Sequence, residues 1–150
     1  ESLWTDIGKI EDYLEINKFL LEKTLHGESV RKVKGGGEIK PPAILGKGSF
    51  VGEGSVIGPY VVLGKNVKVG RNVQIANSII FDGVSIADSC IINGAIVGEN
   101  VTVGRNAKIN EYCVVGDHAV IGDNVTLEKG VTVCPAKEIS GDVPAFKCIL

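Results

Sequence analysis

Residues 45–74 are LGKGSF VGEGSV IGPYVV LGKNVK VGRNVQ, five units of six residues that each begin with Leu, Val or Ile followed by Gly. The same spacing extends outward to residues 39 and 144, except for two units of five residues that begin at Ile75 and Ile92. Eighteen units result, and all eighteen begin with Val, Ile or Leu. A six-residue period sustained over this length is typical of a parallel β-helix.

The other positions of the unit fit one short strand followed by one tight turn. The fourth position is Gly or Asn in nine units, and both residues accept a positive φ at little cost. The fifth position is small or aliphatic almost throughout, so positions one and five are expected to point inward. With three units to a triangular coil, the chain is expected to form about six coils. The stacked first positions then predict three core ladders: Ile39, Ile57, Ile75, Ile92, Ile109 and Leu127; Leu45, Leu63, Ile80, Val97, Val115 and Val133; and Val51, Val69, Ile86, Val103, Ile121 and Ile139.

One predicted corner column carries charges of alternating sign. Its members, one coil apart, are Glu53, Arg71, Asp88, Arg105 and Asp123. We expect an exposed charge ladder in which each pair contributes at most ~1 kcal/mol. The alternative is that solvated corners are simply charged.

Composition excludes several classes of partner. The net charge of −2 and the pI near 5.7 provide no basic field for nucleic acid or for an anionic membrane. No apolar run is long enough to span a bilayer, and no signal peptide opens the chain. We therefore expect a cytoplasmic protein with no nucleic-acid and no membrane partner.

The four cysteines do not form a recognisable disulfide framework. Cys90 and Cys113 occupy the small inward position of units on different faces, which predicts core filling rather than a metal or redox role. Cys134 and Cys148 fall in the C-terminal cap, and no pairing is predicted for them.

The chain outside the repeats differs in character. Residues 1–25 space their apolar side chains as one face of an amphipathic helix, expected over 10–25 with Asp and Glu in its first turn. Residues 26–38 contain three consecutive glycines and predict a flexible linker to the β-helix domain, residues 39–150. The helix is expected to belong to another domain, although it could cover the N-terminal end of the prism. Lys137 in an inward position indicates that the regular coil has stopped, with residues 141–150 folding over that end.

Three stretches of sequence resemble known families. The repeats resemble the left-handed β-helix of hexapeptide-repeat proteins, [LIV]-[GAED]-x-x-[STAV]-x, and the left hand is taken from this resemblance. Residues 4–14, WTDIGKIEDYL, resemble the W-x-D-I-G-T-P-E-D-Y-L segment that closes the catalytic α/β domain of sugar-1-phosphate nucleotidyltransferases. Residues 135–144, PAKEISGDVP, resemble the closing segment of mannose-1-phosphate guanylyltransferases. Lys9 and Ile10 stand where the family has Thr-Pro, which weakens the helix start and leaves the substrate subfamily open.

These resemblances imply the C-terminal oligomerisation or regulatory domain of an enzyme that makes an NDP-sugar, with GDP-mannose favoured by the tail, and pyrophosphate. In that family the Asp of the W-x-D motif helps hold the catalytic Mg²⁺, so Asp6 is the candidate metal ligand; a helix-start carboxylate is the alternative. No Gly-rich nucleotide loop occurs here. We therefore expect no catalytic or cofactor-binding residue in this chain. NTP and sugar 1-phosphate are expected to bind a missing catalytic domain, so this fragment alone would not turn over substrate.

The main alternative is a hexapeptide-repeat acyl- or acetyltransferase that uses acetyl-CoA. Those enzymes use a His as general base between subunits of a trimer. His26 falls in the linker, and His118 occupies a fourth position, where a structural corner with positive φ accounts for it.

A homo-oligomer through the β-helix is also expected, because flat β-helix faces can pack against a second copy. The candidate contact residues are Phe81, which breaks the second-position Gly pattern, and Tyr60 and Tyr112, both in fourth positions.

Overall fold

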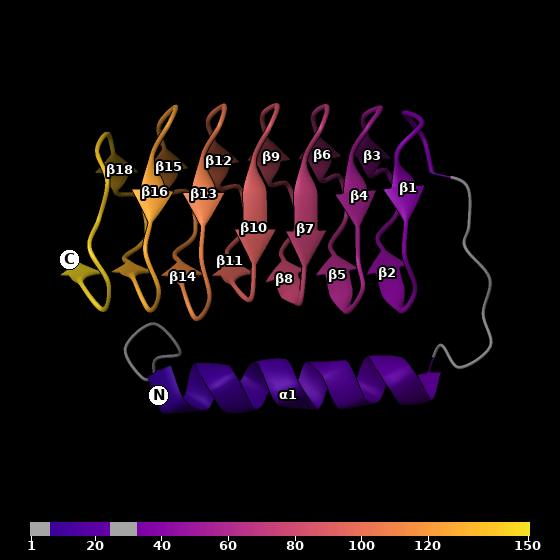
Figure 1. Ribbon diagram of the computed structural model, residues 1–150, viewed down its shortest axis with the longest axis horizontal. Helices are drawn as coiled ribbons and strands as arrows, with labels where there is room; N and C mark the ends of the chain where they lie inside the picture. Colours follow the sequence, from indigo (N-terminus) through magenta and orange to yellow (C-terminus); the bar gives the residue numbers. More distant parts are fainter. Residues whose placement is uncertain (1–6, 25–32) are drawn as a thin grey trace.

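The structure, a computed structural model, describes residues 7–24 and 33–150. Within these residues the helix α1 (Ile7–Thr24) precedes nineteen short strands, which wind into a triangular prism of stacked coils (Figure 1). The parallel β-helix of about six coils that the sequence predicts is confirmed.

The strands form three parallel sheets, which we call faces 1, 2 and 3 after their first strands. Face 1 contains β1 (Glu38–Ile39), β4 (Val56–Ile57), β7 (Gln74–Ala76), β10 (Ile91–Asn93), β13 (Lys108–Ile109) and β16 (Thr126–Leu127). Face 2 contains β2 (Ala43–Leu45), β5 (Val61–Leu63), β8 (Ser78–Ile80), β11 (Ile96–Val97), β14 (Val114–Val115), β17 (Thr132–Val133) and β19 (Cys148–Ile149). Face 3 contains β3 (Phe50–Val51), β6 (Lys68–Val69), β9 (Ser85–Ile86), β12 (Thr102–Val103), β15 (Val120–Ile121) and β18 (Glu138–Ile139).

The core consists of the predicted ladders. On face 1, for example, Ile57 is in register with Ile39 below it and Ile75 above it, and the other first positions follow the same rule on all three faces. The inward first and fifth positions form one continuous buried cluster along the prism. Strands of two or three residues are enough to build this core, because each inward side chain packs on its equivalents in the coils above and below.

The two inward cysteines fill the core as predicted. Cys90 lies beneath face 1 and Cys113 beneath face 2, and both are fully buried. The Cys90 thiol donates to the carbonyl oxygen of Gly104 at 2.9 Å, and the Cys113 thiol donates to that of Glu128 at 3.0 Å. Burial raises the pKa of both thiols, that of Cys113 to about 11.

The corners have the predicted backbone conformation. Fourth positions occupied by Asn have φ between 56° and 62°, and His118 has φ of 63°. The charged corner column differs from the ladder of oppositely charged side chains that the sequence predicts. Asp88 and Asp123 accept hydrogen bonds from the backbone N–H groups of Arg71 and Arg105, at 2.9 and 2.8 Å. These carboxylates therefore join neighbouring coils through arginine backbone rather than through guanidinium groups.

The prediction for the C-terminal end is wrong. The coil does not stop before Lys137, because β18 continues face 3, Val143 bridges to Leu127 on face 1, and β19 pairs with β17 on face 2. Lys137 is exposed although it occupies an inward position. The reason is that no strand stacks on β18 in the described chain, so the lysine side chain can pass the open end into solvent.

The predicted start of the helix is also wrong. α1 begins at Ile7 rather than at residue 10, and its first turn contains no acidic residue, since Glu11 and Asp12 fall in the second turn. The Lys9–Ile10 pair explains this, because without the family's Thr-Pro no cap or proline fixes a later start.

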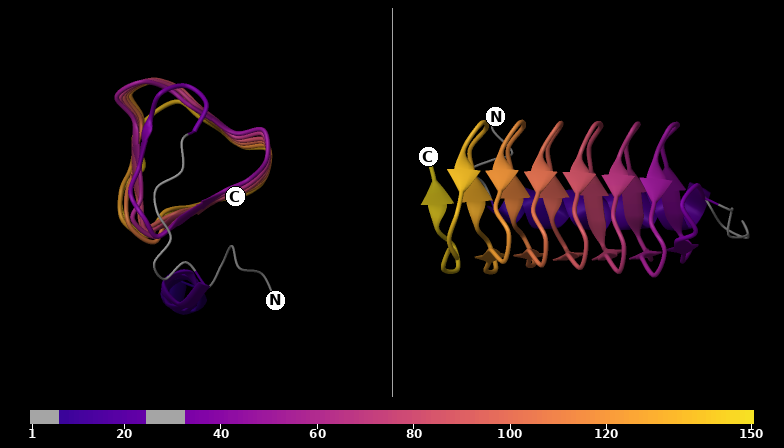
Figure 2. Two further views of the ribbon diagram at one scale, coloured as in Figure 1. Left: turned by 90° about the vertical axis from the view of Figure 1, so that its right-hand side faces the viewer. Right: turned by 90° about the horizontal axis from the view of Figure 1, so that it is seen from above.

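α1 lies along face 2, where it runs parallel to the prism axis and covers neither end (Figures 1 and 2). The option that it covers the N-terminal end is therefore wrong. Backbone pairing of the first coil begins at Lys34, whose carbonyl accepts the N–H of Val51 at 2.8 Å, inside the segment expected to be a linker. In the described part of the chain, no helix has both the length and the apolar character needed to cross a membrane.

Candidate functional site

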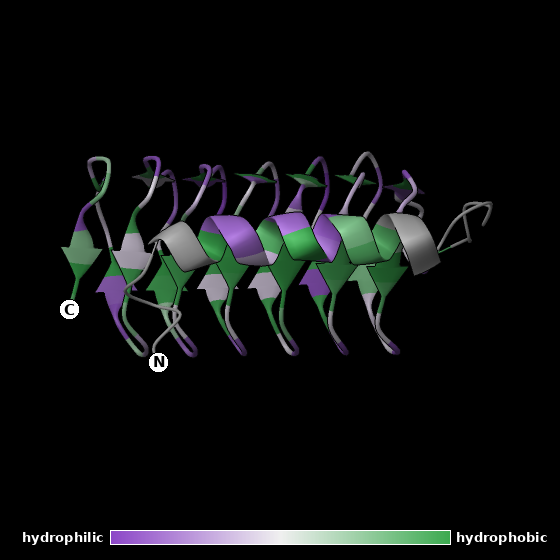
Figure 3. Ribbon diagram, turned by 90° about the horizontal axis from the view of Figure 1, so that it is seen from below, coloured by the Kyte–Doolittle hydropathy of each residue, from purple (hydrophilic) through white to green (hydrophobic). Residues whose placement is uncertain are grey.

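The outward side chains of face 2 explain where α1 lies. The last position of each unit points out of the prism, and on face 2 this column is Ile44, Val62, Ile79, Ile96, Val114 and Thr132. Ile96 and Val114 are fully buried beneath the helix, and Ile79 is 7% exposed. They form a second apolar cluster with Ile10 of α1, separate from the core inside the prism. Figure 3 shows α1 crossing these apolar strands.

All three aromatic residues proposed for contact with a second copy lie close to α1. Phe81 packs against the cluster under α1. Tyr60 and Tyr112 line a groove between α1 and the corner that joins faces 1 and 2. The structure therefore places all three against the helix of the same chain.

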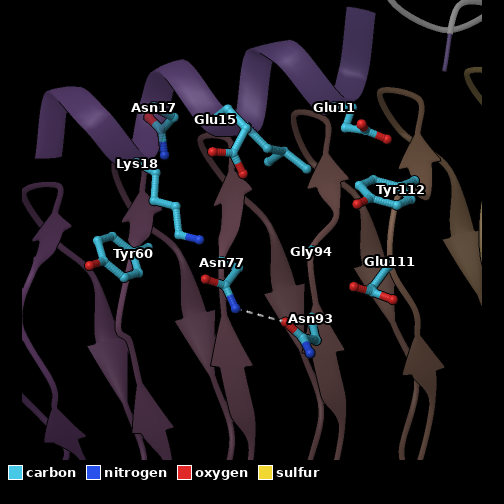
Figure 4. A pocket seen from close by; sticks show the side chains of 11 residues that line it. Glu11, Glu15, Asn17, Lys18, Tyr60, Asn77, Asn93, Gly94, Glu111 and Tyr112 are labelled. Carbon is cyan, nitrogen blue, oxygen red and sulfur yellow. Dashed lines mark hydrogen bonds between the residues drawn. The ribbon is translucent and has the colours of Figure 1, made fainter. Parts of the chain in front are cut away.

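That groove arises from the two short units of the repeat. Both five-residue units lie at the corner between faces 1 and 2, in consecutive coils, where the chain turns at Asn77 and Gly94 with positive φ. The coils on either side keep the full six residues and turn at Tyr60 and Tyr112. The missing residues leave a recess between the two tyrosines, with a volume of about 210 Å³ (Figure 4).

Polar groups line the recess. On its floor the Asn77 side chain donates from Nδ2 to Oδ1 of Asn93 at 3.1 Å. From α1, Glu11, Glu15, Asn17 and Lys18 reach toward it, and Glu111 adds a third carboxylate from the prism (Figure 4).

Each end of the groove has a lysine over a tyrosine ring, and carboxylates also act on the tyrosine at one end. At one end, Lys18 Nζ lies 5.1 Å from the centroid of the Tyr60 ring. At the other end, the carboxylate of Glu11 raises the pKa of Tyr112, with smaller contributions from burial, Glu111 and Glu15. Lys129 Nζ lies 5.4 Å from the centroid of the Tyr112 ring. Each tyrosine therefore already has an ammonium group over its ring.

The residues considered for chemistry lie elsewhere. Asp6 and His26 fall outside the described residues, so Asp6 as a metal ligand stays a prediction. His118 is exposed at the corner between faces 2 and 3, where its backbone N–H donates to Glu99 at 2.8 Å. Across residues 7–24 and 33–150, no group of three or more His, Cys, Asp or Glu side chains could hold a metal ion.

The groove was missed at the level of sequence, although two signals for it were present. The spacing places both short units three steps apart, hence at the same corner, and the last positions of every third unit form the apolar column under α1. Both patterns can be recognised in the sequence alone, once the eighteen units are assigned to the three faces of the prism.

Known structures share the fold. The acetyltransferase domain of PglB from Neisseria gonorrhoeae FA1090 in complex with acetyl coenzyme A is 21% identical, with a TM-score of 0.59 over 75% of this chain and 50% of that chain. A second structure of that domain is 19% identical, with a TM-score of 0.60 over 90% and 62%. PerB from Caulobacter crescentus, in complex with CoA and GDP-perosamine, is 15% identical, with a TM-score of 0.52 over 69% and 48%. At these identities the likeness shows the fold alone, and this chain spans about half the length of those proteins.

The sequence itself matches a family. No curated protein sequence matches the chain significantly. The family model described as the GMPPB C-terminal domain matches residues 39–149, nearly all of the β-helix. This match confirms the resemblance to the C-terminal part of a sugar-1-phosphate nucleotidyltransferase with a left-handed hexapeptide β-helix. The chain therefore belongs to the GMPPB C-terminal domain family.

Proposed function

We propose that this chain is the C-terminal part of an NTP-dependent sugar-1-phosphate nucleotidyltransferase that makes GDP-mannose and pyrophosphate. The family match over residues 39–149 carries the proposal. The guanylyltransferase-like tail at 135–144 and the segment at 4–14 support it from the two flanks of the repeats.

The β-helix would serve this enzyme by positioning its catalytic domain. The segment that resembles the end of a catalytic domain continues directly into α1, and α1 is held on face 2 through Ile10, which is fully buried. A domain attached to this helix would therefore have a defined orientation relative to the prism. Faces 1 and 3 carry no such helix in the described chain and would be open to a second copy, as a homo-oligomer requires.

Chemistry would reside in the catalytic domain, which would bind NTP and sugar 1-phosphate in the cytoplasm. Mg²⁺, when bound, would neutralise charge that develops on the phosphates. The described residues contain no carboxylate set that fits this ion, so only Asp6 is proposed as a ligand from this chain. No reaction step is assigned to the β-helix.

The acyltransferase alternative is supported by fold alone. His118, the one histidine in the described residues, is exposed at a corner that it occupies for its positive φ. The two functions differ in their products, so one experiment separates them.

The test uses the native protein, isolated from source cells with an antibody raised against residues 39–150. With GTP, mannose 1-phosphate and Mg²⁺ we expect release of pyrophosphate that needs both substrates, and a native mass well above 15.8 kDa. Glucose 1-phosphate with ATP or dTTP serves as the comparison for specificity. Release of CoA from acetyl-CoA without release of pyrophosphate would contradict the proposal, and so would a native mass near 15.8 kDa.

A further inference from the structure

α1 buries Ile10 and Leu21, but it leaves other apolar side chains exposed. One flank of the helix exposes Tyr13, Ile16 and Leu20, which are 43%, 59% and 54% accessible. The opposite flank carries Glu11, Glu15 and Lys18, and this polar flank lies over the recess at the corner between faces 1 and 2 (Figure 4). A surface helix normally turns its apolar stripe toward the protein. α1 does so through Ile10, Leu14 and Leu21, and its charged flank is in addition directed at a recess in the protein.

The recess itself is built into the repeat. Two consecutive coils each lack one residue at this corner, while the corner turns elsewhere along residues 39–144 keep full length. Gly94 adds no side chain to fill the space, and a Cβ there would meet Glu111 at 3.2 Å. Tyr60 and Tyr112 stand three coils apart, which separates them by about 14 Å at the usual strand spacing. A hollow with two aromatic ends therefore lies under the helix.

The charges of the lining exclude several kinds of ligand. Glu11, Glu15 and Glu111 outweigh Lys18, so phosphates and nucleotides would meet net repulsion. The carboxylates do not converge on a metal site within the described residues. Organic cations would meet ammonium groups already placed over both rings. Apolar ligands would leave the Asn77 and Asn93 amides and the carboxylates without water.

We propose that the recess binds a neutral, polyhydroxylated ligand, a single sugar ring. Carboxylates accept hydrogen bonds from hydroxyl groups, and each carboxamide can both donate and accept. The side-chain amides of Asn77 and Asn93 form one hydrogen bond with each other, which leaves further donor and acceptor positions on both. Because the two tyrosine rings stand about 14 Å apart, one sugar ring would lie against only one of them. The face of the Tyr112 ring that Lys129 does not cover is an apolar surface for the C–H bonds of a sugar. The recess, with a volume of about 210 Å³, has room for one ring with its hydroxyl groups.

Titration of the ¹⁵N-labelled 150-residue chain with methyl α-mannopyranoside, followed by NMR, tests this proposal. The inference goes beyond the proposed function, and the readout needs no catalytic activity. We expect saturable shifts of the Asn77 and Asn93 side-chain amides and of the Gly94 backbone amide. In Tyr112→Asn, affinity should fall about three- to tenfold, because an aromatic wall is lost. Asn keeps the positive φ of this corner, as it does at Asn106 and Asn124.

His118→Asn is the control, because it also places Asn at a corner with φ of 63°, but away from the groove. It should leave the affinity unchanged. GDP-mannose should bind more weakly than the methyl glycoside, because its phosphates would meet the carboxylates; equal shifts with both would contradict a site for a neutral ligand. Shifts with GDP alone, shifts with spermidine but with no sugar, equal weakening by His118→Asn, or no saturable shift at the recess would each overturn the proposal.

Discussion

Faces 2 and 3 of the prism have the same interior and different exteriors. Inside, both stack a ladder of branched aliphatic side chains over six coils. Outside, face 2 presents Ile79, Ile96 and Val114, while the equivalent positions of face 3 are Ser85, Thr102 and Val120. The helix lies on face 2 and leaves face 3 bare (Figure 2). The inward positions therefore determine the β-helix, and the outward positions determine what the β-helix holds.

The largest effect should come from a charge placed under the helix. Ile96→Asp puts a carboxylate where the side chain is fully buried, at a cost above about 3 kcal/mol if the helix stays in place. We expect α1 to leave face 2 while the prism persists, because the ladders inside are untouched. Limited proteolysis should then cut α1 rapidly. Thr102→Asp, at the same position of the neighbouring unit on face 3, should change neither proteolysis nor stability; equal effects of both variants would contradict the comparison.

The helix side of the same contact should give the next largest effect. Ile10→Ala removes a fully buried side chain, and about 2–5 kcal/mol is typical for such a truncation. Ile16→Ala, on the exposed flank of α1, should stay within about 0.5 kcal/mol. Hydrogen exchange of the α1 amides measures both. If Ile16→Ala accelerated exchange as much as Ile10→Ala, the helix would lie on the prism by another flank.

The reactivity of the cysteines tests whether the core is equally inaccessible to reagents behind a bare face and behind the face that α1 covers. Cys90 lies behind bare face 1 and Cys113 behind covered face 2, yet both are fully buried. Both should resist iodoacetamide in the native protein, while the exposed Cys148 reacts quickly. Mass spectrometry of the modified peptides would show this. Reaction of Cys90 but not of Cys113 would mean that α1, rather than the coil packing, excludes reagents.

The same burial predicts a dependence of stability on pH. The folded pKa of Cys113, about 11, exceeds its ordinary value of 9.0, so folding favours the neutral thiol. The contribution is complete below pH 9 and is lost as the pH rises from about 9 to about 11. Urea unfolding across this range should show a decline that is shallower in Cys113→Ala. An unchanged slope in that variant would assign the decline to other groups.

The smallest effects should come from the corners, which do not depend on the helix. Asp117 lies at the corner between faces 2 and 3 and Asp123 at the corner between faces 3 and 1, and their carboxylates each accept one backbone N–H at 2.8 Å. Replacement of either by Ala should cost about 1 kcal/mol, as loss of one hydrogen bond does. Chemical denaturation of the two variants would measure these losses. A much larger loss at Asp117 would show that the helix-covered side of the prism is constrained differently.

The sequence was sufficient to predict the fold because the repeat has one dominant requirement. Every third unit must stack, so the register of Ile57 on Ile75 follows from counting residues. The ends and the extension obey no such rule. Lys137 looked like a break in the coil, but at an open end an inward position can lead to solvent. The position of α1 depends on contacts between its apolar residues and the outward apolar column of face 2. Neither the periodicity of the helix nor the composition of the linker predicts these contacts. The groove depends on that placement, so its site could not be predicted from either part alone.

The contact between α1 and face 2 is the central claim, and NMR of methyl-labelled protein tests it most directly. The measurement is the set of NOEs from the Ile10 methyl groups. The structure predicts cross-peaks to the methyl groups of Ile96 and Val114, which share a buried cluster with Ile10. Absence of these cross-peaks, with α1 shifts characteristic of a solvent-exposed helix or coil, would contradict the account.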